Sequence, residues 1–146
     1  MGPFASQRKR VARAACARLL GYGLVRLQPG QRPCAYHFHH VNEEWFYVRS
    51  GYGRLRTADG EWGLRPGDAF GCPAGADGVH GLVNSGDTPL EYFALSTMEE
   101  PEVVVYPDSD KVYAMVGAAP GGNPDARSVD LIVRRRDAVA YEEGEP

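Results

Sequence analysis

Long hydrophobic segments are absent from this chain. None of its apolar runs reaches the ~18 residues that a membrane-spanning helix needs, so we expect no membrane association. The basic N-terminus does not resemble a secretory signal, because Arg13 and Arg18 interrupt any apolar core there.

Cysteine is also scarce. The three cysteines, at positions 16, 34 and 72, cannot all pair with one another and show no CxxC spacing. This usage fits a reducing compartment better than a secreted disulfide framework, so a cytoplasmic location is expected. Cys34 and Cys72 are expected to be small buried apolar residues, with a redox role as the alternative.

Acidic residues are missing from the first 42 positions, which contain seven Arg or Lys. Residues 99–146 reverse this pattern with eleven acids against five bases, and the net charge of the whole chain is −3. A chain of negative net charge is not expected to bind nucleic acid. The two ends either neutralise each other across one surface, which we favour, or bind an anionic partner.

Glycine and proline, by contrast, are abundant: 18 Gly and 11 Pro separate short β-rich segments. This composition is typical of an all-β sandwich or barrel. One helix is expected over Ala5–Leu20, and a two-residue turn at Asp59-Gly60 predicts a hairpin. The expected strands are Tyr22–Gln28, Cys34–His39, Glu44–Arg49, Arg54–Ala58, Glu61–Leu64, Val79–Asn84, Leu90–Ser96, Val103–Tyr106, Lys111–Val116 and Leu131–Arg135.

The length of the chain indicates a single domain. Residues 1–20 are expected to form a basic N-terminal segment, helical or irregular. Residues 21–116 are expected to form the β-barrel core. Residues 117–146 would add a loop, a final strand and an acidic tail.

All four histidines fall in two short segments, with His37, His39 and His40 in the first and His80 in the second. Residues two apart in a strand face the same side, so His37 and His39 can project together into a core. With Glu44 they would supply imidazole and carboxylate groups, which are ligands for divalent transition metals. A metal-free, hydrogen-bonded pocket is the alternative.

The two segments closely resemble the paired motifs of the cupin superfamily. The first motif, G(x)5HxH(x)3-4E(x)6G, matches His37, His39, Glu44 and Gly51. The second motif, G(x)5PxG(x)2H(x)3N, matches Gly67, Pro73, Gly75, His80 and Asn84. Two spacings are longer than in the pattern, before His37 and before His80, and both fall in loops.

This resemblance implies a fold and a site. The fold would be a double-stranded β-helix, a jelly-roll-like cupin barrel. The ligands of one divalent transition metal (Fe2+, Mn2+, Ni2+ or Zn2+) would be His37, His39, Glu44 and His80. His40 is expected at the surface or behind the ligands, and Asn84 is expected to support a turn.

Further similarity covers most of the chain from about Val11 onward. It includes residues 24–30, 105–111 and 136–141, which look like those of small, largely uncharacterised bacterial cupins. The expected function is a metal-dependent enzyme acting on a small organic molecule, most specifically an oxygenase. A Lewis-acid isomerase, epimerase or cyclase and a non-catalytic small-molecule-binding cupin are the alternatives.

The remaining expectations concern the positions of aromatic and basic residues on the strands. Trp45, Tyr47 and Phe93 are expected to pack between sheets or at a dimer contact, and a homodimer is expected. Three arginines are expected at the surface: Arg49, Arg54 and Arg56. The alternative is that they lie at the barrel mouth and attract an anionic substrate.

Overall fold

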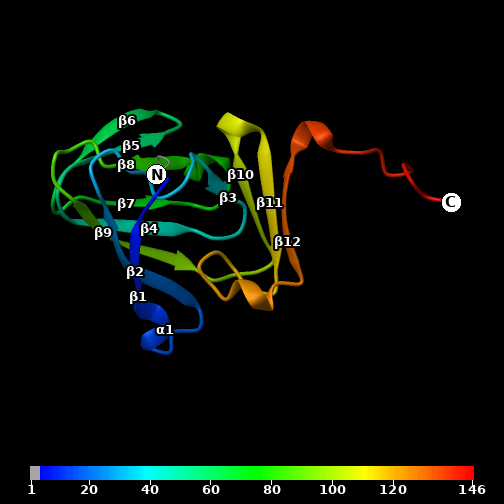
Figure 1. Cartoon of the computed structure of the whole chain (residues 1–146), viewed down its shortest axis with the longest axis horizontal. Helices are drawn as coiled ribbons and strands as arrows, with labels where there is room; N and C mark the ends of the chain where they lie inside the picture. Colours follow the sequence, from blue (N-terminus) through cyan, green and yellow to red (C-terminus); the bar gives the residue numbers. More distant parts are fainter. Residues whose placement is uncertain (1–3) are drawn as a thin grey trace.

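Three antiparallel sheets form the framework of the structure (Figure 1). The computed structural model describes residues 4–146. The strands are β1 (Gln7–Arg10), β2 (Leu20–Leu27), β3 (Phe38–His39), β4 (Glu44–Ser50), β5 (Gly53–Thr57), β6 (Gly60–Leu64), β7 (Ala69–Cys72), β8 (His80–Val83), β9 (Leu90–Thr97), β10 (Glu102–Tyr106), β11 (Lys111–Val116) and β12 (Val129–Arg134). The helical elements are α1 (Val11–Ala14) and the short 3-10 turns η1 (Ala76–Gly78), η2 (Pro107–Ser109), η3 (Pro124–Ala126) and η4 (Arg135–Asp137).

The sheets have the strand orders β1-β2-β9-β4-β7, β12-β11-β10-β3 and β6-β5-β8. Five of the nine neighbouring pairs in these sheets join strands that are not consecutive in sequence, as in a barrel whose two halves wind around each other. The predicted all-β, double-stranded β-helix is therefore confirmed. Within residues 4–146, no helix is long and apolar enough to cross a bilayer.

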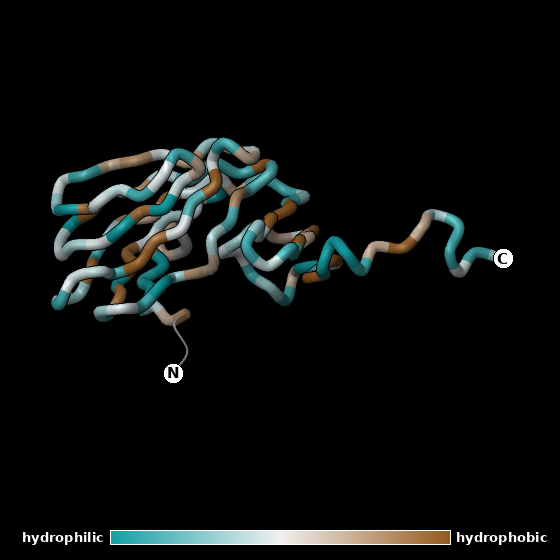
Figure 2. The backbone as a smooth tube through the Cα atoms, turned by 90° about the horizontal axis from the view of Figure 1, so that it is seen from above, coloured by the Kyte–Doolittle hydropathy of each residue, from teal (hydrophilic) through white to brown (hydrophobic). Residues whose placement is uncertain are grey.

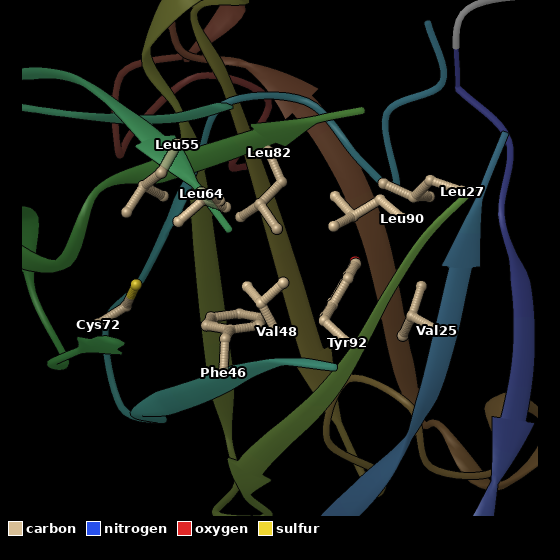
Figure 3. Packing of buried hydrophobic residues seen from close by; sticks show 10 residues of the cluster. All are labelled: Val25, Leu27, Phe46, Val48, Leu55, Leu64, Cys72, Leu82, Leu90 and Tyr92. Atoms are coloured by element: carbon tan, nitrogen blue, oxygen red, sulfur yellow. The ribbon is translucent and has the colours of Figure 1, made fainter. Parts of the chain in front are cut away.

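A buried apolar cluster fills the barrel between the sheets (Figure 3). Strand alternation supplies it: Phe46 and Val48 of β4 are buried, whereas Trp45 and Tyr47 between them are exposed. The cluster consists of Val25, Leu27, Phe46, Val48, Leu55, Leu64, Cys72, Leu82, Leu90 and Tyr92. The expectation that Cys72 is a buried apolar residue is thereby confirmed.

The helix expected over Ala5–Leu20 is wrong for most of its length. Only Val11–Ala14 is helical, and Gln7–Arg10 forms strand β1, which pairs with β2. In residues 7–10, hydrogen bonding along the β2 edge outweighs helix propensity. Residues 1–3 of the predicted N-terminal segment lie outside the described residues.

Most other predicted strands are confirmed to within two residues at each end, with three differences. The strand expected over Cys34–His39 is reduced to Phe38–His39, because the chain changes pairing partner at His37. Strand β7 was not predicted, since Ala-Phe-Gly-Cys is short and contains no β-branched residue.

The third difference is the hairpin turn, which shifts by one residue. Thr57 pairs with Gly60, so the turn residues are Ala58 and Asp59. The Thr57 hydroxyl accepts the Asp59 N–H at 3.3 Å and so fixes this register. Of the expected turn pair, only Gly60 has positive φ, at 139°.

The C-terminal segment extends away from the sheets in both views (Figures 1 and 2). It follows β12, an edge strand whose residues are all exposed. Val139 and Tyr141 beyond it are 67% and 93% exposed. This end of the chain therefore contributes little to the core.

Candidate metal centre

His37 and His80 are brought together by a backbone bridge. The His37 N–H donates to the His80 carbonyl at 3.0 Å, and the His80 N–H donates to the His37 carbonyl at 2.8 Å. Their rings lie 4.6 Å apart between centroids, and both side chains are buried. Two histidines that are 43 positions apart (80 − 37) thus become neighbours.

His39 and Glu44 enter the same space from two other strands. His39 lies in β3 opposite Val104 of β10, and Glu44 begins β4 opposite Ser96 of β9. The donor atoms of His37, His39 and Glu44 all lie within 4.8 Å of one another.

The three imidazoles converge on a single carboxylate oxygen. Oε2 of Glu44 lies 3.9 Å from Nε2 of His37, 3.4 Å from Nε2 of His39 and 3.2 Å from Nε2 of His80. All four residues predicted as ligands are therefore gathered at one point inside the barrel.

The other nitrogen of each ring has an acceptor that sets the ring orientation. Nδ1 lies 2.8 Å from the Ala35 carbonyl in His37 and 2.9 Å from the Gly78 carbonyl in His80. In His39, Nδ1 lies 3.3 Å from Oε2 of Glu102. Because the acceptors occupy Nδ1, the Nε2 atoms are the ones presented to the cavity.

Electrostatics in this cluster are strongly perturbed. Burial lowers the pKa of His37 to about 4. Burial also opposes the charged forms of His39 and His80, but hydrogen bonds outweigh it and raise their pKa values to about 9 and about 10, respectively. Burial disfavours the Glu44 carboxylate as well, yet bonds from His39 and His80 hold its pKa well below the usual range. Perturbation of this kind is typical of functional sites.

The arrangement fits a divalent transition metal. Three imidazoles with oriented rings and one ionised carboxylate form a nitrogen-oxygen donor set suited to Fe, Mn, Ni or Zn. A structural zinc site would more typically be tetrahedral and rich in cysteine. The donor groups also lie at the wall of a cavity, where an exogenous ligand has access.

The cavity has a volume of about 250 Å³ and a mostly apolar lining. Several polar groups besides the candidate ligands also line it, and the sequence did not single them out: Arg8, Tyr92, Tyr106, Tyr113 and Arg127. Burial raises the pKa of Tyr106 to about 12, and it raises the pKa of Tyr92 despite the opposing effect of Arg8. Both phenols therefore remain protonated at neutral pH.

Cys34 also lines the cavity, with its Sγ 3.7 Å from Nδ1 of His37. It is partly buried, and burial raises the pKa of its thiol to about 12. A protonated thiol is a poor nucleophile, which agrees with its expected apolar role.

Glu102 is another buried residue that the sequence did not single out. It is fully buried and, besides its contact with His39, accepts backbone N–H bonds from Val41 at 3.2 Å, Asn42 at 3.1 Å and Val103 at 2.8 Å. The Asn42 side-chain amide also donates to it. These donors and His39 hold the pKa of its carboxyl at about 2. No spacing in the sequence linked it to the histidines.

Two of the neighbouring residues lie as expected. His40 is exposed, and its ring packs edge-on against Phe38. Asn84 is buried and supports a turn, since its amide donates to the Leu27 and Thr88 carbonyls and accepts the Gly86 N–H.

The three arginines expected at the surface are confirmed there. Each is paired with an acid: Arg49 with Glu91, Arg54 with Glu61 and Arg56 with Asp108. Trp45, Tyr47 and Phe93 do not pack between sheets, because they are 43%, 39% and 37% exposed.

Comparison with known proteins agrees with this geometry. A family model for the cupin domain matches residues 23–96. A sugar phosphate isomerase of the cupin superfamily from Silicibacter pomeroyi is 26% identical with a TM-score of 0.79, over 94% of this chain and 82% of that chain. A protein named as a candidate sugar phosphate isomerase, from Acidithiobacillus ferrooxidans, is 28% identical with a TM-score of 0.77, over 94% and 81%.

More distant similarity extends to the TT1209 protein of Thermus thermophilus, which is 27% identical with a TM-score of 0.56, over 66% of this chain and 86% of that chain. No curated protein sequence matches the chain. The family match, the fold and the intact paired motifs agree, and the chain belongs to the cupin superfamily.

Proposed function

We propose that this cupin is a metal-dependent isomerase of a small hydroxycarbonyl compound, with one divalent transition metal bound by His37, His39, Glu44 and His80. When bound there, the metal would act as a Lewis acid that polarises a substrate carbonyl. The proposal differs from the oxygenase expected first, because the cavity holds a further group that can exchange protons.

That group is Tyr92, the observation that carries the proposal. It is 2% exposed, and it lines the same cavity as the candidate ligands. It lies in the buried cluster close to Phe46, whose ring centroid is 6.0 Å from that of Tyr92 (Figure 3).

An isomerisation between an aldehyde and a ketone moves protons between adjacent carbons and between adjacent oxygens. Tyr92, which burial keeps protonated at neutral pH, can donate its hydroxyl proton to the carbonyl oxygen while the adjacent C–H proton passes to water. It recovers a proton from the other hydroxyl of the resulting enediol as water returns a proton to the other carbon. The ring of Tyr106 stacks on His37 with centroids 5.9 Å apart, so its side chain also contacts the ligand cluster. The apolar walls, which include Val25, Leu82 and Met115, limit the access of water.

The similar structures support the same reaction class. Both relatives that cover 94% of this chain carry the name sugar phosphate isomerase. Because one fold hosts many activities, the names support the proposal only together with the cavity chemistry.

An oxygenase is the second candidate. Its support is the donor set, because three imidazoles and one carboxylate leave two positions on a six-coordinate ion for substrate and dioxygen. A non-catalytic binding cupin is the third.

One experiment separates the three. Protein loaded in turn with Fe(II), Mn(II), Ni(II) and Zn(II) is incubated with aldoses, ketoses and their phosphates in deuterated buffer, while dioxygen is monitored. An isomerase interconverts aldose and ketose without consuming dioxygen. Stoichiometric dioxygen consumption would support the oxygenase, and saturable binding without turnover would support the binding module.

We also propose that the protein is a homodimer and that it is located in the cytoplasm. Trp45 and Tyr47 stack in parallel on the outer face of β4, with centroids 6.4 Å apart, and Phe93 is exposed on neighbouring β9. An exposed aromatic patch of this kind is typical of an interface. Light scattering of the purified protein tests it, with Trp45→Ser as the variant expected to dissociate the dimer.

A further inference from the structure

The edge strand β1 presents two arginines to the inside of the barrel. Arg8 pairs with Val25 of β2, and Arg10 pairs with Gly23. Directly opposed residues in an antiparallel pair face the same side of the sheet. Val25 is buried in the barrel, so Arg8 and Arg10 belong to the inner face of the same sheet that carries Glu44, with both arginines exposed at its edge.

Small residues occupy the inner face between these arginines and Glu44. Across the sheet, Arg10 pairs with Gly23, which pairs in turn with Ala94. Two residues further along the strands, Gly21 pairs with Ser96, which pairs in turn with Glu44. The Met98 side chain lies against Gly21 and the Lys9 carbonyl lies against Gly23, so neither glycine leaves open space directly above it. A groove of about 420 Å³ is nevertheless lined by this part of the sheet together with the loop residues 120–123.

This groove continues into the cavity of the candidate metal centre. Six residues line both spaces: Arg8, Val25, Glu44, Ala94, Pro120 and Gly121. Arg8 and Glu44 therefore lie where the groove meets the cavity, and a ligand at the metal ligands can extend along the sheet toward β1.

The groove is positively charged. Four bases line it and Glu44 is its single acid; the bases are Arg8, Lys9, Arg10 and Arg18. None of the ion pairs within residues 4–146 includes any of the four. By contrast, Arg127 in the metal cavity is neutralised by Asp130 at 3.0 Å. The charge of β1 is thus left available for a ligand.

Arg8 already influences groups in the cavity. It lowers the pKa of the Tyr92 hydroxyl and of the Cys34 thiol, against the larger raising effect of burial on both. Its guanidinium charge therefore acts on the same space that Tyr92 and the candidate ligands line.

We propose that Arg8 and Arg10 bind the phosphate group of the substrate, so that the substrate is a small phosphate monoester with its carbonyl end at the metal ligands. This inference rests on the proposed function for the carbonyl end only. A phosphate dianion suits paired guanidinium groups, which offer several N–H donors in a fixed plane.

The spacing fits such a molecule. Three strand intervals separate β1 from β4 in the sheet, which corresponds to about 14 Å along its surface. The arginine side chains reach over part of this span, and a phosphorylated chain of a few carbons covers the remainder. An unphosphorylated analogue would leave both guanidinium groups without an anionic partner, since Arg8 has only a hydrogen bond to the Ser6 hydroxyl.

The test measures binding to Arg8→Gln, Arg10→Gln and the double variant, with Arg49→Gln as the control. Arg49 is exposed and paired with Glu91, so its replacement removes the same charge away from the groove. Chelator-treated protein is titrated with inorganic phosphate, and metal-loaded protein with ribose 5-phosphate and with ribose. Circular dichroism and metal content establish that each variant is folded and loaded.

We expect the double variant to bind inorganic phosphate and ribose 5-phosphate at least about tenfold more weakly, while Arg49→Gln binds both as the unchanged protein does. We also expect ribose to bind more weakly than its phosphate, and equally to all variants. Equal phosphate affinity in the double variant, or an equal loss in Arg49→Gln, would overturn the assignment. Failure of metal loading would instead count against the proposed function, because the titration with inorganic phosphate needs no metal.

Discussion

Nδ1 of His39 and Oε2 of Glu102 lie 3.3 Å apart, although the two residues are separated by 63 positions in the chain. The contact joins β3 to the first residue of β10 and is fully buried. A carboxylate behind a ligand histidine fixes the ring orientation and raises its basicity. In the proposed metal site, Glu102 would therefore act as a positioning residue for His39.

Replacing Glu102 tests this relationship. Glu102→Gln should weaken metal affinity by about 10- to 100-fold, because His39 loses its anionic partner. Competition titration with a chromophoric chelator measures the affinity. Glu99→Gln is the control, since Glu99 is exposed and only its backbone bonds to Asn42. Equal affinity in Glu102→Gln and the unchanged protein would remove Glu102 from the site.

His80 and His40 provide a matched pair for the ligand assignment. His80→Ala should abolish stoichiometric metal binding and leave a folded barrel, because its Nε2 is one of the groups converging on Glu44. Glu44→Ala should have the same effect. His40→Ala should retain the metal, since its ring is exposed and packs on Phe38. Unchanged metal content in both His80→Ala and Glu44→Ala would refute the four-ligand set.

Tyr92 tests the isomerase proposal. Tyr92→Phe should lower turnover by about 100-fold or more, which is the range for loss of a general acid or base. Thermal stability and metal content should remain close to those of the unchanged protein, because Phe keeps the ring in the buried cluster and Tyr92 is not one of the candidate ligands. Tyr47→Phe on the outer face is the control. Full activity in Tyr92→Phe would show that another group moves the protons.

Gly51, which ends the first motif, lies against neighbouring backbone and also has positive φ. These two effects on stability can be measured separately. Gly51 and Gly67 both have positive φ, at 81° and 94°. A Cβ at Gly51 would meet the Pro89 carbonyl and the Leu90 backbone, whereas none of the described atoms lies within 4 Å of a Cβ at Gly67.

Gly67→Ala should therefore cost only the strain of the left-handed conformation, about 1 kcal/mol. Gly51→Ala should cost roughly 1–3 kcal/mol more, because β4 and β9 must move apart. Urea unfolding of both variants measures the difference. Equal losses of stability would mean that the contact with Pro89 relaxes freely.

The residues themselves predicted the all-β class and grouped His37, His39 and Glu44, whereas the barrel type and the addition of His80 came from the resemblance to the cupin motifs. Alternation along strands places His37 and His39 on one side, and the motif glycines mark turns that only a few geometries satisfy. These are local properties, and they survive errors of one or two residues in strand boundaries.

Glu102, Tyr92 and the inward arginines of β1 could not be predicted in the same way. Tyr92 lies beside Val48 of β4 and Val25 of β2 only through the register of three strands that are far apart in sequence. Arg8 seemed to belong to a helix, because its pairing with β2 cannot be seen in the local sequence.

Elemental analysis of protein purified without an affinity tag or chelator tests the central claim most directly. The account predicts about one equivalent of a divalent transition metal per chain in the unchanged protein and in His40→Ala, and none in His80→Ala. Metal-free protein that also fails to bind added Fe(II), Mn(II), Ni(II) and Zn(II) would contradict it.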